Sequence, residues 1–184
     1  MASDEFKFLA NRTGILKKRF FPPLNPTAQY TTAQEDSMRA LRMLFHAEVE
    51  HYLEKMSKKL AADLEREVNG LNNSSSVKQW AIKSAKEALV AGNSNNGIKD
   101  SDIKQMFSPL GFTDADFENI NPSFLSTMKT FGKRRGDVAH QSVMNVTYSI
   151  TRQTDEKMID EIMQFLRLFD KLLEKRRLYG FFNI

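Results

Sequence analysis

The sequence predicts an all-α fold, because two long segments show helical periodicity and no regular strand alternation competes with them. In each segment the apolar side chains recur at steps of three and four residues, which places them on one face of a helix. With 184 residues the chain is long enough for one domain with a sizeable core. The early stripe consists of Met38, Leu41, Phe45, Val49, Tyr52, Met56, Leu60 and Leu64, and the late stripe of Met158, Ile162, Phe165, Leu166, Phe169, Leu172 and Leu173.

The N-terminal part of the chain is predicted to be an extended arm. It has little periodicity, and its segment Phe20–Pro26 contains three prolines, which oppose helix and favour extended backbone. We therefore divide the chain into an arm over residues 1–34 and a helical domain over residues 35–184. Because Phe20 and Leu24 are apolar, we expect the arm to pack on the bundle or on a partner subunit.

The helical domain is expected to begin with its longest helix, followed by a loop and a second helix. Thr32 and Glu35 have the spacing of a capping box, and the helix that they open should run to about Val68. Residues 69–76 are rich in Gly, Asn and Ser and predict a loop. The next helix should cover about 77–91, with an apolar side made of Trp80, Ile82, Ala85 and Leu89.

Shorter helices are predicted in the middle of the chain, before a long closing helix. Two of them, over 101–107 and 114–119, flank a turn at Pro109-Leu110-Gly111, and Asn121-Pro122 is a favourable start for a third. This third helix should reach the basic residues around 133–135. Residues 143–150 are rich in β-branched side chains and are compatible with an extended segment, and residues 155–179 should form the closing helix. The third helix should turn Phe124, Leu125, Met128 and Phe131 inward.

Composition excludes several classes of protein. There is no cysteine, hence no disulfide, thiolate zinc site or thiol nucleophile. The sequence has no apolar run of membrane-spanning length and no signal-peptide core, so we expect a cytoplasmic protein without a membrane partner. Glycine-rich phosphate loops and His-Glu-x-x-His are missing. His46 and His51 are a poor pair of zinc ligands, because they are five residues apart on one helix, so neither a metal nor a cofactor is expected.

The strongest chemical signal is an arginine cluster followed by a histidine, in the segment Lys133–His140. An arginine guanidinium donates to phosphate through a rigid fork of N–H groups. Histidine exchanges protons near neutral pH, so the two types together can cleave RNA without a metal. The net charge of +4 permits a polyanionic partner but does not require one.

Three pairs satisfy the spacing Arg-x(4–6)-His, and their positions distinguish them. Arg39 and His46 lie inside the first long helix beside core positions, so we interpret them as structural. Arg134 and Arg135 are each correctly spaced from His140. We favour Arg135 with His140. Five residues of regular helix separate two side chains by about 140°, so we expect Gly136 to break or bend the helix and let them converge.

The chain resembles a HEPN domain, a name that abbreviates higher eukaryotes and prokaryotes nucleotide-binding. The resemblance covers roughly residues 35–180. It rests on the helix segment Leu44–Leu53 with its acid at Glu50, on the motif from Arg135 to His140, and on the long closing helix. Two positions depart from the family pattern. Gly136 occupies a place that is often polar, and Ser142 occupies the place of the tyrosine in members regulated by adenylylation.

The resemblance implies a helical bundle that dimerises, so that two Arg-x(4–6)-His motifs meet in one cleft. Many such domains are metal-independent endoribonucleases of toxin–antitoxin, anti-phage or CRISPR-associated systems. It assigns Arg135 and His140 as the catalytic pair. Lys133 and Arg134 would bind flanking RNA phosphates.

Other roles and a second function stay open. Asp137 could orient a catalytic side chain and is equally explained as a solvated surface acid. Glu50 could reach the site from the first helix, but we favour its interpretation as an exposed helix acid. Expected partners are RNA, a second copy of the chain, and an antitoxin or another regulatory protein. The alternative function is a non-catalytic HEPN-like scaffold that binds nucleotide or protein.

Overall fold

All regular structure in the described residues is helical, which confirms the all-α fold. The computed structural model describes residues 2–70, 75–94, 97–140 and 151–177, and over residues 135–140 it describes the backbone alone. These ranges contain seven α-helices, one 3-10 turn and no strand, and the ambiguous stretch 143–150 lies outside them. In chain order the elements are α1 (Asp4–Phe20), α2 (Thr32–Asn69), α3 (Ser76–Ser94), α4 (Asp100–Phe107), the 3-10 turn η1 (Ser108–Leu110), α5 (Asp114–Ile120), α6 (Phe124–His140) and α7 (Arg152–Arg176).

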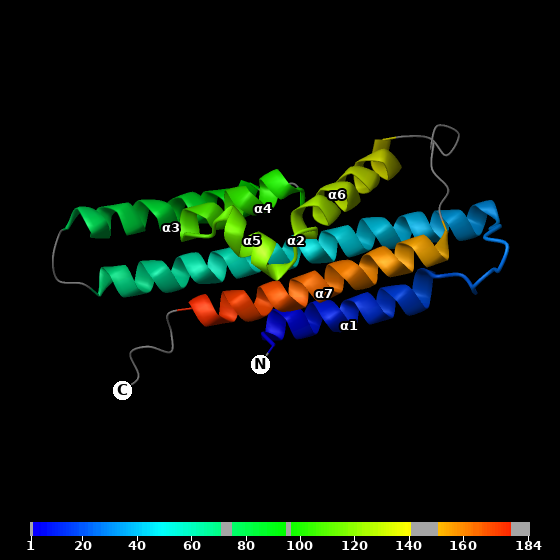
Figure 1. Ribbon diagram of the computed structural model, residues 1–184, viewed down its shortest axis with the longest axis horizontal. Coiled ribbons are helices and arrows are strands. Elements are labelled where there is room, and N and C mark those ends of the chain that lie inside the picture. The colour runs from blue at the N-terminus through cyan, green and yellow to red at the C-terminus, as the bar shows by residue number, and fades with distance from the viewer. Residues whose placement is uncertain (1, 71–74, 95–96, 141–150, 178–184) are drawn as a thin grey trace.

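Helix α2 is the axis of the molecule. It has 38 residues and contacts α1, α3, α4, α6 and α7. Figure 1 shows α1 and α7 beside α2, α3 folded back along the C-terminal half of α2, and α6 leaving the bundle at an angle. The C-terminal half of α6 thus lies toward the end of the bundle where α2 and α7 begin.

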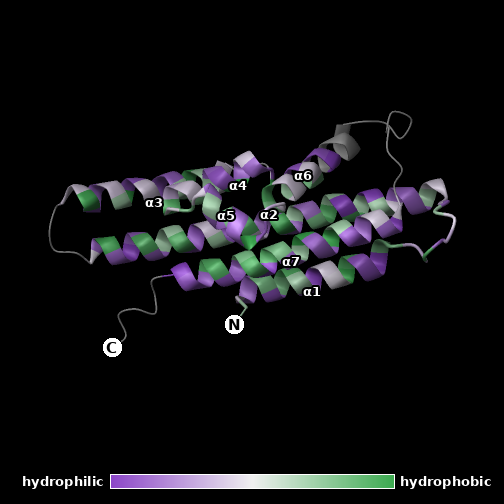
Figure 2. Ribbon diagram, viewed as in Figure 1, coloured by the Kyte–Doolittle hydropathy of each residue, from purple (hydrophilic) through white to green (hydrophobic). Residues whose placement is uncertain are grey.

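The two predicted apolar stripes form most of the core. Every predicted position of α2 is buried except Leu64, which is half-buried, and on α7 only Met158 and Leu172 are less than fully buried. Figure 2 shows the resulting alternation of apolar and polar residues around both helices. Ring contacts then join α4, α5 and α6 to α7. They connect Phe107, Phe112, Phe117, Phe124, Phe165 and Phe169, with centroids 4.9 to 6.3 Å apart.

The prediction of an extended N-terminal arm is wrong over half of its length, because Asp4–Phe20 forms α1. The three prolines lie beyond this helix and prevent helix formation only in the segment that follows it. Leu9 and Leu16 are buried in the same core cluster as α2 and α7, so no core boundary lies at residue 34. Residues 21–31 contain no helix. Phe20 packs against the core as expected, whereas Leu24 is exposed.

A buried hydrogen-bond network fixes the start of α1. The fully buried carboxylate of Asp170 on α7 accepts from the Ser3 backbone N–H at 2.9 Å and from the Ser3 hydroxyl. It also accepts from the Tyr52 hydroxyl of α2 at 3.0 Å. Burial, together with the negative charge of Asp170, raises the pKa of Tyr52 well above its ordinary value, so the phenol stays protonated and donates. The network joins three helices that are distant in sequence.

We predict that α1 contributes substantially to stability. Leu9→Ala should lower the free energy of unfolding by about 2–5 kcal/mol, because Leu9 is buried between helices and its truncation leaves a cavity. The matched variant Phe8→Ala changes an exposed neighbour on the same helix and should cost no more than about 0.5 kcal/mol. Urea unfolding measures both. Equal effects of the two variants would show that α1 does not belong to the cooperative core.

Helices α2 and α3 differ from prediction in two details. The capping box of α2 is formed by Thr31 and Gln34, one residue before the predicted pair. Trp80 was predicted to face inward and is instead 62% exposed. The reason is that α3 packs on α2 through small residues. Ala85 and Ala88 are fully buried there, and the close approach that they allow leaves no room for an indole.

Candidate functional site

The Arg-x4-His motif forms the C-terminal part of α6. The helix runs without interruption from Phe124 to His140, so the predicted break at Gly136 is wrong. A glycine inside a helix costs only about 0.5–1 kcal/mol relative to alanine, which a helix held by packing tolerates. The side chains of Arg135, Asp137 and His140 lie outside the described residues, and their catalytic roles stay predictions.

The helix that carries the motif is anchored to α2 immediately before it. Phe131 is buried, and its ring stacks on His46 with a centroid distance of 6.0 Å and an interplanar angle of 30°. The same ring makes an edge contact with Phe45 at 5.4 Å. Because Phe131 precedes Arg135 by about one helical turn, these contacts place the motif directly beyond the core.

His46, the histidine of the competing pair, is a core residue. Its side chain is 2% exposed, and its Nδ1 lies 3.7 Å from the Glu50 carboxylate one turn later on α2. Arg39 forms an ion pair with Asp36 on the same helix at 3.5 Å. The structural interpretation of Arg39 and His46 thus agrees with their positions. Glu50 is half-buried beside His46, so it is not the fully exposed helix acid of the favoured interpretation.

A buried ion pair that the sequence analysis missed joins α2 to α7 near the motif. The Arg42 guanidinium binds Asp155 through Nε, at 3.0 and 2.9 Å from the two carboxylate oxygens, and through Nη2 at 2.6 Å. Both side chains are 2% exposed. Burial raises the pKa of Asp155, and the positive charges of Arg42 and Arg134 oppose that shift. Asp155 lies in the first turn of α7, so the pair fixes where α7 begins relative to α2.

The basic residues before the motif have different surroundings. Lys133 is exposed at the surface of α6. Arg134 is half-buried, and its Nη1 lies 3.6 Å from the Met158 sulfur of α7. Arg134 also acts electrostatically on Asp155. Thus Lys133 is accessible to a phosphate, whereas Arg134 faces the junction of α6 and α7.

The missed ion pair did leave a signal in the sequence. Arg42 falls on the apolar stripe of α2, four residues after Met38 and four before His46. Asp155 falls on the stripe of α7, seven residues before Ile162. A basic residue on one buried helix face and an acidic residue on another predict a buried pair, because an isolated buried charge is costly.

Two other kinds of functional feature are absent from the described residues. They contain no group of three or more histidine, aspartate or glutamate side chains placed to hold a metal ion. In the same part of the chain, no helix combines the length and apolar character needed to cross a membrane.

Comparison with known proteins identifies a family. A model of the family described as RiboL-PSP-HEPN matches residues 16–175, from within α1 to the end of α7. No curated protein and no solved structure matches the chain. The match covers most of the chain and confirms the resemblance that the sequence suggested. The chain belongs to the RiboL-PSP-HEPN family.

Proposed function

We propose that this HEPN protein is a metal-independent endoribonuclease whose active site is formed by two copies of the chain. Family membership supports a nuclease-like or nucleotide-binding domain. The observation that favours cleavage is the position of the Arg-x4-His motif. It occupies the C-terminal end of α6, one helical turn after the buried Phe131, where the helix leaves the bundle at an angle.

In the proposed reaction, His140 of one chain removes the proton of the ribose 2′-hydroxyl, whose oxygen then attacks the adjacent phosphorus. His140 of the second chain protonates the leaving 5′-oxygen. Arg135 binds the non-bridging phosphate oxygens and stabilises the charge that develops on them. The products are a 2′,3′-cyclic phosphate and a 5′-hydroxyl, so the cleavage step consumes no water.

The surrounding residues take supporting roles in this proposal. Lys133, exposed on α6, binds a flanking phosphate, and Arg134 adds positive charge at the junction with α7. Glu50 takes an auxiliary role from α2, and Asp137 orients a catalytic side chain. The enzyme would act in the cytoplasm as a toxin or an anti-phage component, with an antitoxin or another protein as regulator.

The decisive test is incubation of the purified protein with end-labelled RNA in excess EDTA, with His140→Ala as control. Cleavage by the wild type alone, with cyclic-phosphate ends, supports the proposal. RNA binding without cleavage would instead favour the alternative, a non-catalytic HEPN-like scaffold for nucleotide or protein.

We predict that the active protein is a homodimer. The mechanism needs one base and one acid, and each chain has a single histidine at the end of α6, so a two-fold axis must supply the second. Light scattering at micromolar concentration should give twice the mass of the chain. A monomer with full ribonuclease activity would rule out the composite site.

A further inference from the structure

Helix α3 has an unusual distribution of side-chain sizes. Small residues, among them Ala85 and Ala88, face α2 and are buried. Large apolar residues point outward: Val77, Trp80 and Val90 are 69%, 62% and 66% exposed. Of these three residues, Val90 lines a groove, so its apolar surface is open to a partner there.

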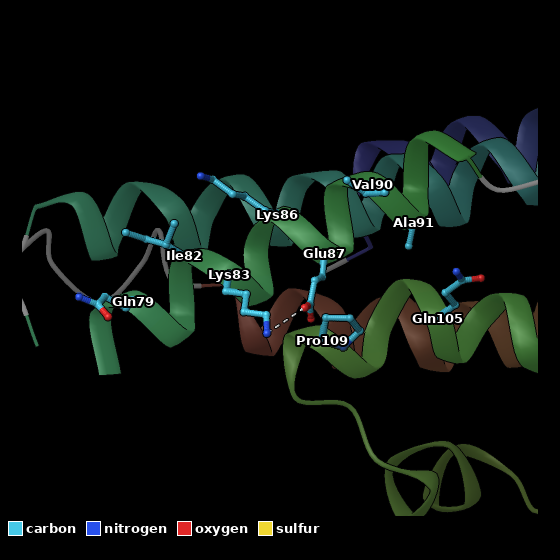
Figure 3. Close-up of a pocket in the computed structure, with 9 residues that line it drawn as sticks. All are labelled: Gln79, Ile82, Lys83, Lys86, Glu87, Val90, Ala91, Gln105 and Pro109. Atoms are coloured by element: carbon cyan, nitrogen blue, oxygen red, sulfur yellow. Dashed lines mark ion pairs between the residues drawn. The ribbon is translucent and has the colours of Figure 1, made fainter. Parts of the chain in front are cut away.

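This groove has a volume of about 800 Å³ and lies between α3 on one side and α4 with η1 on the other. Figure 3 shows Ala91 of α3 facing Gln105 of α4 across it, with Pro109 of η1 below Glu87. Along α3 the lining extends from Gln79 to Ala91, which at 1.5 Å per residue is about 18 Å. That length matches about three turns of a bound helix.

The charge around the groove is positive. The lining residues of the groove include Lys83, Lys86 and Glu87, with a net charge of +1, and Glu87 is paired with Lys83 at 3.8 Å. Lys86 lines the same groove and is exposed. An apolar groove with a positive rim complements an amphipathic helix that has acidic residues beside its apolar face.

Two exposed apolar surfaces of a second copy, on α1 and α7, fit the groove poorly. The exposed apolar residues of α1, Phe8 and Ile15, belong to a helix with five basic and two acidic residues. On α7, exposed Leu168 is flanked by Arg167 and Lys171. Both surfaces would bring positive charge against the lysines of α3.

We propose that the groove between α3 and α4 binds an acidic amphipathic helix of a partner protein. The site lies on the C-terminal half of α2, away from the motif at the end of α6. The interaction is therefore independent of whether the protein cleaves RNA, and a partner bound there would leave the motif uncovered.

Trp80 provides a direct probe, because it is the only tryptophan of the chain and lies beside the lining residue Gln79. The full-length protein is titrated with two tryptophan-free amphipathic peptides of about four helical turns. Both have leucines at the same helical spacing, and their remaining positions carry glutamate in one and lysine in the other. We expect a saturable blue shift of Trp80 emission with the acidic peptide and at least about tenfold weaker binding of the basic one.

Variants assign the binding to the groove. Val90→Asp should remove binding of the acidic peptide, whereas Leu168→Asp, which places the same charge at an exposed leucine of α7, should leave it unchanged. The double variant Lys83→Glu/Lys86→Glu should reverse the preference between the peptides. All four positions are on the surface, so thermal unfolding should show intact folds.

Four results would overturn the proposal. The first is no saturable shift with either peptide, and the second is equal affinity for both that charge reversal does not alter. The third is a lower sedimentation coefficient of Val90→Asp without peptide, which would assign the groove to a second copy of the chain. The fourth is displacement of the acidic peptide by an RNA oligonucleotide, which would assign the groove to nucleic acid.

Discussion

Replacing His140 or Arg135 with alanine is expected to reduce RNA cleavage to background. The loss should be at least about 10²- to 10⁴-fold for the histidine, because it removes general acid and base together, and at least about 10²-fold for the arginine. The double variant should be no worse than the more damaging single one, since both groups act on one transition state. Initial rates of cleavage in EDTA measure these effects, while light scattering and thermal unfolding check that dimer and fold persist.

RNA binding and RNA cleavage should respond differently to substitutions in this region. His140→Ala should still bind RNA, because the histidine moves protons and carries little of the phosphate affinity. Arg135→Ala and Lys133→Ala should bind more weakly, each with a shallower dependence of affinity on salt, since fewer counterions are released. Filter binding over a range of salt concentrations distinguishes the two classes. Loss of binding in His140→Ala would mean that the histidine holds RNA and does not act in proton transfer.

His46→Ala is the internal control for the choice of motif. His46 is buried and stacks on Phe131, so its truncation should lower stability but leave cleavage largely unchanged below the melting temperature. If His46→Ala is inactive at a temperature where it is fully folded and dimeric, the competing pair of Arg39 and His46 contains the catalytic histidine.

Sequence periodicity predicts this fold well where a helix is long and buries one face. The stripes of α2 and α7 contain many regularly spaced apolar residues, and so long a regular pattern rarely arises by chance. Helix α1 was not predicted because its buried face has only four positions, and one of them is the polar Thr13. The proline-rich segment that follows it also favoured the interpretation as an extended arm. The prediction that Trp80 faces inward was wrong because hydrophobicity alone does not indicate how closely two helices approach.

The candidate site was predictable only in part, for a different reason. The motif is local in sequence, so its residues could be named and its helix anticipated. The pair of Arg42 and Asp155 joins residues 113 positions apart, and only the packing of α2 against α7 brings them together. The course of α6 through Gly136 differs from the prediction because a single glycine costs a helix only about 0.5–1 kcal/mol, too little to interrupt it.

Breaking the Arg42–Asp155 pair should be among the most destabilising changes in the protein. Asp155→Ala leaves a buried guanidinium without its carboxylate and should cost about 3–5 kcal/mol, a large part of the stability of an ordinary domain. Asp36→Ala, which removes the largely exposed partner of Arg39 on the same helix, should cost no more than about 1 kcal/mol. Urea unfolding at low temperature measures both. Similar small losses would mean that water or another group replaces the missing carboxylate.

Removing the arginine instead should make stability depend on pH with a defined sign. In Arg42→Met the carboxylate of Asp155 stays buried without its main opposing charge, so its pKa rises further above that of the unfolded chain. Between those two pKa values the folded state binds more protons than the unfolded state, and stability therefore falls as pH increases. Arg42→Met should be more stable at pH 5 than at pH 7.5, and adding Asp155→Asn should remove this contribution. If both variants show the same pH profile, Asp155 remains ionised without Arg42, and a further positive charge such as that of Arg134 must hold the start of α7.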